Sequence, residues 1–411
     1  MATKRWKGQA QDTAQVNTIT PANVGVGNTF TVTINSKSYT FTATAGTVAN
    51  VTAGLAALLQ ASVEGEFTEI TWADATTAIT ATAKTKGKPF TQTSSASGGT
   101  ATNVTAVTPA NVSRNDINNA TNWSPSGVPG AADDVYIDNS SISLLYNLDA
   151  LAAVTFTSLT IDQSFTGDVG LSETNSDGTE YLEYRPQYFQ CGATTITIGR
   201  GEGSGSGMVK IDNVALATTM NVIDSGSPKE DGREAILWKG THASNVINIT
   251  GGSLGVAIFG GEVATVATLR MGSGLLGAAE PSVRCGAGVT LTTITKEAGT
   301  LEIGSSLTTL NNHGGDVTIN AGTITTLTVN AGTCSYLGTG TITTVNIAGG
   351  ATMDLSGVPV GRTFTNTNMH AGARLHDPAS TVTFSTAIVP TRCDISDLIL
   401  TLGKNRGFTP A

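Results

Sequence analysis

Pairs of threonines return at a nearly fixed interval between residues 283 and 350, and this repeat limits the possible folds more than any other feature of the chain. The pairs begin at Thr292, Thr308, Thr325 and Thr343, which gives intervals of 16, 17 and 18 residues. Each unit holds two short alternating runs, with small or turn-forming residues between them. One such unit cannot bury its own apolar face, so stacked units must share a continuous core. The repeat therefore predicts a parallel β-helix, or solenoid.

Composition supports a mainly β fold. The 411 residues include 48 glycines and only 13% charged residues, and threonine, valine, isoleucine and asparagine crowd the repeats. Such residues favour strands and turns, whereas long runs of leucine, glutamate, lysine and alanine suited to helices are nearly absent. The fold class we predict is mainly β, with a small N-terminal α+β, sandwich-like domain followed by the parallel β-helix.

Charge and hydropathy argue against two classes of partner. Lysine and arginine number 22 against 31 aspartates and glutamates, so the net charge is −9, and the acids are scattered. A nucleic-acid interface needs clustered positive charge, so we expect no nucleic-acid binding. No apolar run approaches the roughly 20 residues of a membrane helix, so we expect no membrane insertion. The basic start of the chain leads into polar residues, which predicts synthesis in the cytoplasm without a secretory signal.

Changes of pattern along the chain predict five segments. A solenoid end needs a cover, because it would otherwise expose apolar core and unpaired strand edges. Trp123 is the expected cover of the first coil, and Arg5 and Trp6 are expected to dock the start of the chain on a neighbour. The segments are an N-terminal arm (1–16), a small α+β docking domain (17–112), a linker and solenoid cap (113–134), the parallel β-solenoid (135–356), and a C-terminal cap or oligomerisation segment (357–411).

The pattern of residues 17–112 predicts strands around one helix. Phe30, Val32 and Ile34 alternate as one face of a strand that leads into a hairpin. Thr47 is expected to cap a helix that runs to about Gln60. Two further strands are expected near residues 67–72 and 79–83.

An insertion at residues 173–190 concentrates four of the chain's aromatic residues beside acids and an arginine. Two roles fit this composition: a subunit interface, where aromatic residues and arginine are enriched, or a carbohydrate-binding surface, where tyrosine rings stack on sugars. The candidate residues for either role are Glu180, Tyr181, Glu183, Tyr184, Arg185 and Tyr188.

Catalysis has weaker support in the residues. Glycoside hydrolysis needs two carboxylates roughly 5–10 Å apart beside a groove, and Glu180, Glu183 and Asp168 are the acids available near the insertion. The glycine-rich run at 201–207 lacks the ending of a phosphate-binding loop, so we interpret it as a turn. Four widely spaced cysteines, with no close pair, do not indicate zinc or redox chemistry. We therefore expect no catalytic residues, no metal and no cofactor, and predict that the protein is not an enzyme.

Three stretches resemble proteins of tailed phages and prophage regions: residues 41–55, residues 122–137, and the run Tyr184-Arg185-Pro186 taken with the glycine-rich run at 201–207. The resemblance covers most of the chain. More distantly, the solenoid is similar to phage tailspikes and to bacterial β-helix adhesins.

The resemblance implies a virion structural protein displayed on the particle surface, as a head decoration, head fibre, tail fibre or spike. It also implies assembly in the host cytoplasm, contact with capsid or tail proteins, and a homotrimer, because such decorations and fibres are commonly three-fold. A host surface glycan is a further possible partner. The alternative is a carbohydrate-binding or polysaccharide-degrading β-helix tailspike.

Overall fold

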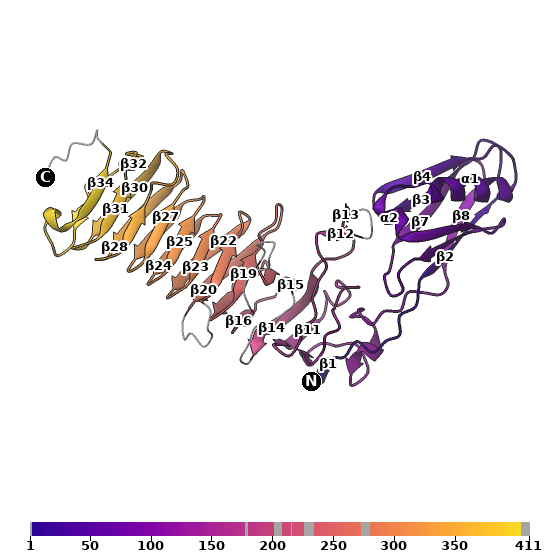
Figure 1. Ribbon diagram of the computed structural model, residues 1–411, viewed down its shortest axis with the longest axis horizontal. Helices are drawn as coiled ribbons and strands as arrows, with labels where there is room; N and C mark the ends of the chain where they lie inside the picture. Colours follow the sequence, from indigo (N-terminus) through magenta and orange to yellow (C-terminus); the bar gives the residue numbers. More distant parts are fainter. Residues whose placement is uncertain are drawn as a thin grey trace.

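The computed structural model describes residues 2–176, 180–200, 208–214, 216–225, 234–272 and 280–403. Within them the protein is mainly β. Figure 1 shows a long stack of strands that ends near the C-terminus, and a smaller group of strands and helices at the opposite end. None of the helices among the described residues is long and apolar enough to cross a membrane.

The stack consists of parallel strands that alternate between two sheets, since each strand pairs with the strand two places further along the chain. The first sheet contains β10 (Asp134–Ile137), β11 (Thr155–Asp162), β14 (Phe189–Arg200), β16 (Thr219–Val222), β18 (Val246–Ile249), β20 (Ala264–Met271), β22 (Val289–Lys296), β24 (Leu307–Asn312), β26 (Ile324–Val329), β28 (Thr341–Ile347) and β30 (Arg362–Met369), with β32 (Val382–Phe384) and β33 (Val389–Pro390) beside β30.

The second sheet starts from the first residues of β14 and runs alongside the first sheet. It contains β15 (Val209–Asn213), β17 (Ile236–Lys239), β19 (Ser253–Val256), β21 (Ser282–Cys285), β23 (Thr300–Ile303), β25 (Asp316–Ile319), β27 (Thr333–Tyr336), β29 (Thr352–Asp354), β31 (Arg374–Asp377) and β34 (Ile399–Leu402). One strand in each sheet per coil is the arrangement of a β-helix-like solenoid, as the repeat predicts.

The register stacks apolar residues in columns inside the solenoid. Leu310, Leu327 and Val345 are neighbours on β24, β26 and β28, and all three are fully buried. Burying each such side chain stabilises the fold by roughly 1.5–3 kcal/mol. Between these positions, threonines such as Thr309 and Thr326 face outward and also stack. The inward and outward positions in the repeat at residues 283–350 agree with the alternation in the sequence.

Glycines close the turns that lead into the strands of the second sheet. Gly299, Gly315 and Gly332 all have positive φ, at 86°, 68° and 73°. A Cβ on Gly332 would lie 2.1 Å from the carbonyl oxygen of Gly315 in the coil before it. Only glycine tolerates both the left-handed backbone and this close approach. Glycine at these turns therefore allows each coil to stack directly on the coil before it.

The start of the chain belongs to the solenoid, which corrects the expected docking arm. β1 (Thr3–Trp6) pairs in parallel with β10 and antiparallel with β9 (Trp123–Ser124). Trp6 is fully buried, its ring centroid lies 5.2 Å from that of Trp123, and its Nε1 donates to the Ile142 carbonyl at 2.7 Å. Arg5 pairs with Asp138. The two tryptophans pack together in the core at the first coil of the solenoid, where Trp123 is expected to act as the cover.

Residues 16–107 form two small antiparallel sheets and two helices around a separate apolar core, which we name the N-terminal module. The sheets have the orders β5-β6-β2-β8 and β4-β3-β7. The elements are β2 (Val16–Ala22), β3 (Thr29–Ile34), β4 (Lys37–Thr42), α1 (Val48–Gln60), α2 (Gly65–Thr68), β5 (Ile70–Asp74), β6 (Ile79–Ala83), β7 (Gln92–Ser97) and β8 (Thr102–Val107).

Local signals of the module agree with the sequence in most places. The Thr47 hydroxyl accepts a hydrogen bond from the Asn50 backbone N–H at 3.3 Å and caps α1, and Phe30, Val32 and Ile34 are fully buried. Residues 65–68 are the short helix α2, so the strand expected from residue 67 begins instead at residue 70.

The stack continues past the boundary expected at residue 356. β30 pairs with β28 over six positions, β31 pairs with β29, and β34 pairs with β31. Phe364 and Met369 still point into the core and are fully buried. The interval between coils lengthens here, so the threonine pairs no longer mark it, but alternation within each strand persists. A short 3-10 helix, η2 (Ile395–Asp397), precedes β34, and another, η1 (Ala120–Asn122), precedes β9.

Candidate functional site

The insertion predicted as an interface forms a hairpin that contacts the N-terminal module. Its strands β12 (Thr174–Ser176) and β13 (Glu180–Leu182) pair antiparallel, with Asn175 opposite Tyr181. In Figure 1 the hairpin rises from the solenoid and lies beside α2. The side chain of Glu180 lies outside the described residues, and so does the glycine-rich run at 201–207.

Glu69, between α2 and β5, is the centre of the contact. Its carboxylate accepts hydrogen bonds from the Tyr181 hydroxyl at 2.7 Å and from the Tyr184 hydroxyl at 3.1 Å. It also pairs with the Lys88 ammonium at 2.8 Å and with the Arg185 guanidinium. The Glu69 side chain is only 4% exposed, so these partners replace nearly all of its water. We call this set, together with Glu183, the Glu69 cluster.

Arg185 carries the contact to further groups on both sides. Its Nε donates to the Pro89 carbonyl of the module at 2.7 Å, and its Nη1 pairs with Glu183 at 3.0 Å. Glu183 in turn accepts a hydrogen bond from Asn175 at 2.6 Å. Two carboxylates and two cations thus compensate each other in a buried place, which is the condition under which buried charges are tolerated.

Burial also fixes the protonation of the two tyrosines. It raises the pKa of Tyr181 and of Tyr184 above the usual tyrosine range. Both hydroxyls therefore keep their protons and act as donors to the Glu69 carboxylate. Their rings lie against each other with centroids 6.2 Å apart, and the Arg185 guanidinium lies 4.5 Å from the centroid of the Tyr184 ring.

Tyr188 lies at the base of the hairpin in a second group of charges. The Lys239 ammonium is 4.2 Å from its ring centroid, and the Lys210 ammonium is 5.5 Å away. Lys239 is within 3.8 Å of Asp212, and Lys210 pairs with Glu173. Burial raises the pKa of Tyr188 above its usual range. This group ties the hairpin to β15 and β17 of the second sheet.

The geometry explains what the candidate residues contact. Tyr181 and Tyr188 are each 6% exposed, so their rings offer little open face for a sugar to stack on. Asp168 accepts a hydrogen bond from the Met208 backbone N–H at 2.7 Å, whereas Glu183 accepts one from the Arg185 backbone N–H at 2.9 Å. The contact found is therefore one between two parts of the same chain. That these residues contact a second subunit or bind a glycan stays a prediction.

The sequence did not predict that Glu69 and Lys88 belong to this contact. Each stands alone among polar residues of the module, and the hairpin residues they meet are about a hundred positions later in the chain. One signal was available: Glu69 directly precedes the apolar alternation of Ile70 and Trp72, where a carboxylate next to a buried strand needs a partner.

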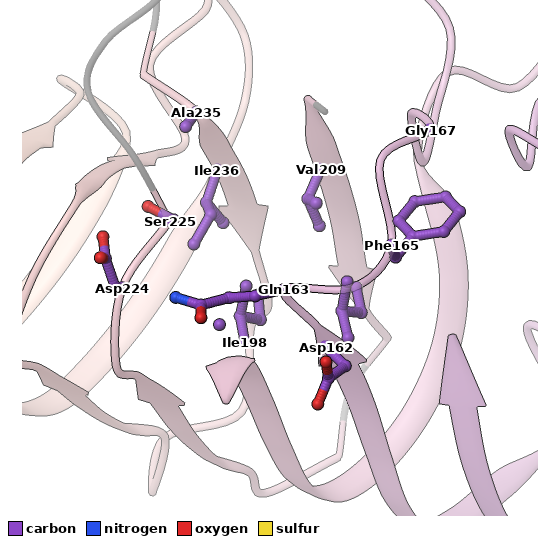
Figure 2. Close-up of a pocket in the computed structure, with 12 residues that line it drawn as sticks. Asp162, Gln163, Phe165, Gly167, Ile198, Val209, Asp224, Ser225, Ala235 and Ile236 are labelled. Atoms are coloured by element: carbon purple, nitrogen blue, oxygen red, sulfur yellow. The ribbon is translucent and has the colours of Figure 1, made fainter. Parts of the chain in front are cut away.

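A small, partly open cavity lies between the first coils of the solenoid, but it is too small for a substrate. Figure 2 shows the Gln163 side chain extending across it toward the segment that carries Asp224 and Ser225, with Ile198, Val209 and Ile236 beside it. Its volume is about 20 Å³, and a single water needs roughly 10–15 Å³ measured in this way. The cavity has space for one water molecule.

The cysteines and acids of the described residues show no metal centre. Cys191, Cys285 and Cys334 are buried, and burial raises the pKa of Cys285 and of Cys334 to about 12, so both thiols stay protonated. Within the described ranges, no group of three or more histidine, cysteine, aspartate or glutamate side chains is placed to hold a metal ion.

The fold and the contact define a class: a β-helix-like solenoid with a small module held against it by a buried ionic cluster. Comparisons with protein-family models, with curated proteins and with solved structures found no match.

Proposed function

We propose that the protein is a non-enzymatic structural component of a phage particle, displayed on its surface as a head decoration, head fibre, tail fibre or spike. The observation that supports this most is a continuous hydrogen-bonded stack from β1 to β34 that is braced to the N-terminal module. Such a body resists bending, because every strand is bonded to its neighbours along the whole length. Stiffness suits a part that projects from a particle.

In this proposal the N-terminal module, within residues 17–112, is the docking domain that contacts capsid or tail proteins. Three of its large apolar side chains are exposed, Val26 at 71%, Val63 at 79% and Val104 at 60%. A partner that covered these side chains would gain stability by removing apolar surface from water. The Glu69 cluster would then hold the solenoid at a fixed angle to the particle.

The proposed oligomer is a homotrimer that forms in the host cytoplasm before or during assembly. Val389, Ile395 and Ile399 near the end of the stack are 49%, 44% and 42% exposed. Contact between copies at this end would cover them, together with the edge of the last strands. Edges of this kind otherwise invite uncontrolled pairing.

Cryo-electron microscopy of purified particles, with mass spectrometry of their proteins, tests the proposal. We expect the chain in the particles at a fixed copy number, as rods that disappear when its gene is deleted. Mass photometry of the purified chain should give about three times the 41.8 kDa of one copy. Absence of the chain from washed particles would overturn the structural role, whereas a mass of one or two copies would overturn only the trimer.

A further inference from the structure

A groove of about 400 Å³ lies on the outer face of the second sheet, lined by residues of β21, β23 and β25 and by Glu234, which precedes β17. This volume falls within the roughly 300–1,000 Å³ of ordinary ligand sites. The polar side chains of its lining are Glu234, Ser282, Arg284, Thr300, Glu302, Asp316 and Thr318. The groove is separate from the Glu69 cluster, and the functional proposal above does not use it.

The register of the second sheet lines up charged residues across the groove. Gly255, Arg284, Glu302 and Thr318 are neighbours on β19, β21, β23 and β25, and all belong to outward positions. Arg284 Nε lies 3.7 Å from Glu302 Oε2, and both side chains are nearly half exposed. The Asn320 side chain donates to the other oxygen of Glu302 at 2.6 Å. Arg284 therefore lines the groove beside an oriented carboxylate, and its nearly half-exposed guanidinium can donate to a ligand.

Glu234, just before β17, adds a buried carboxyl group, one oxygen of which lacks a hydrogen-bond partner among the described residues. The residue is only 6% exposed, and its Oε2 has no hydrogen-bond partner among the residues that the structure describes. A Cβ on Gly255 would lie 3.1 Å from this oxygen, so the missing side chain of Gly255 is what leaves space for it. A buried polar atom without a partner has a free-energy cost. A ligand that supplied the missing hydrogen bond would recover part of that cost.

Burial raises the pKa of Glu234 above the ordinary glutamate value, while Arg284 partly opposes the rise. The carboxyl group can therefore donate as well as accept hydrogen bonds closer to neutral pH than an exposed glutamate. This property suits a ligand group that also does both, such as a hydroxyl.

The charges of the groove select among ligand classes. Three carboxyl groups against one arginine repel an acidic ligand such as a uronate or a phosphate. A lysine or arginine side chain of a protein partner gains little here, because Glu302 is already paired with Arg284 and burial raises the pKa of Glu234 toward its uncharged form. The lining hydroxyls of Ser282, Thr300 and Thr318 offer both donors and acceptors. A neutral ligand with many hydroxyl groups satisfies all of these constraints.

We propose that this groove binds a neutral glycan, with Glu234, Arg284 and Glu302 as the residues that hydrogen-bond its hydroxyls. The site differs from the tyrosine-rich insertion, whose rings are largely covered within the chain. It gives the second sheet a recognition role in addition to the structural role of the stack. Binding by the purified chain does not depend on whether the chain is found in particles, so the two proposals can fail separately.

Saturation-transfer NMR and calorimetry on the full chain test the groove, with maltoheptaose, cellohexaose, mannohexaose and N-acetylchitohexaose as neutral probes and penta-galacturonate as the acidic one. We expect at least one neutral oligosaccharide to bind and the galacturonate to bind at least about tenfold more weakly. Glu234→Ala and Arg284→Gln should each weaken the neutral ligand by about tenfold or more, as the loss of a hydrogen bond to a charged or buried group predicts.

Glu297→Gln is the matched control, because Glu297 is an exposed carboxylate that does not line the groove, and its binding should equal that of the parent chain. Circular dichroism melting checks that each variant is folded, and Arg284→Gln, at an exposed position, covers the case in which Glu234→Ala does not fold. The proposal is overturned if no neutral probe binds, if the galacturonate binds as well as the neutral probes, or if a folded Arg284→Gln variant binds like the parent.

Discussion

Replacing Glu69 with glutamine keeps the shape of the side chain but removes the charge that Lys88 and Arg185 share. The Lys88 and Arg185 side chains are 9% and 6% exposed, so water cannot take over the role of the carboxylate. Breaking a buried ion pair from one side typically costs about 3–5 kcal/mol, because a charge is left buried without compensation. Glu183 still compensates Arg185 at 3.0 Å. We therefore expect the lower end, about 3 kcal/mol.

Hydrogen exchange measured by mass spectrometry locates this loss, since it reports the local opening of each segment. A loss of about 3 kcal/mol corresponds to roughly a hundredfold faster exchange where local opening limits protection. We expect it in peptides that cover β13 and β5, with little change in β24 to β28 of the solenoid. Small-angle scattering should also show a wider spread of module positions.

Glu64→Gln is the control for this experiment. Glu64 also pairs with a lysine, Lys37, but the two side chains are 42% and 38% exposed. Exposed pairs contribute about 0–1 kcal/mol, so exchange should change by less than about fivefold. If β13 in Glu69→Gln exchanges no faster than in Glu64→Gln, then the Glu69 cluster does not hold the module and the reasoning is refuted.

Three further predictions concern the solenoid. Burial lowers the pKa of Lys296 to about 8, against 10.5 for an ordinary lysine, so between these pH values the unfolded chain binds more protons than the folded chain. The free energy of unfolding should therefore rise with pH, by up to about 3 kcal/mol. Urea unfolding at pH 7 and pH 10 should show this rise, and the rise should be smaller in Lys296→Met. Leu327→Ala should cost about 2–5 kcal/mol and Thr325→Ala less than about 0.5 kcal/mol by the same assay, because the first is fully buried and the second exposed; equal losses would contradict the inward register. Trp6→Ala should cost about 3–5 kcal/mol and expose the first coil to proteolysis, and unchanged protease resistance would show that β1 does not cover it.

The repeating part of the fold was predictable because the contacts between the coils of a solenoid follow the sequence repeat. Residues in contact, such as Leu310 and Leu327, are separated by one interval of the repeat, so the interval itself reveals which side chains are neighbours. The cap of α1 at Thr47 was also predictable, since it depends on a local signal. The sequence of each coil therefore determines both its core and its neighbours.

Contacts that depend on distant residues were not predictable in this way. Trp6 belongs to a strand of four residues with no period of its own, and its partner Trp123 is more than a hundred positions away. Glu69 and Arg185 are similarly far apart in the sequence, and the residues around each give no indication that the two side chains are in contact. The last coils were missed for a related reason, because longer turns after residue 356 changed the interval while the pairing of β28 with β30 continued.

The departures from the repeat are also where the chain can bind something. In the regular coils, outward side chains such as Asn346 and Thr328 bond to one another along the stack, so their donors and acceptors are already used. At the groove the column is interrupted: Gly255 has no side chain, and the Glu234 carboxyl occupies its space, with Oε2 lacking a hydrogen-bond partner among the described residues. A solenoid needs no such feature for its stability, since a serine or threonine at position 255 would continue the polar column. The interruption costs stability and leaves an unfilled hydrogen-bonding position on a residue that lines the groove, and that combination is why we assign recognition to this face of the second sheet.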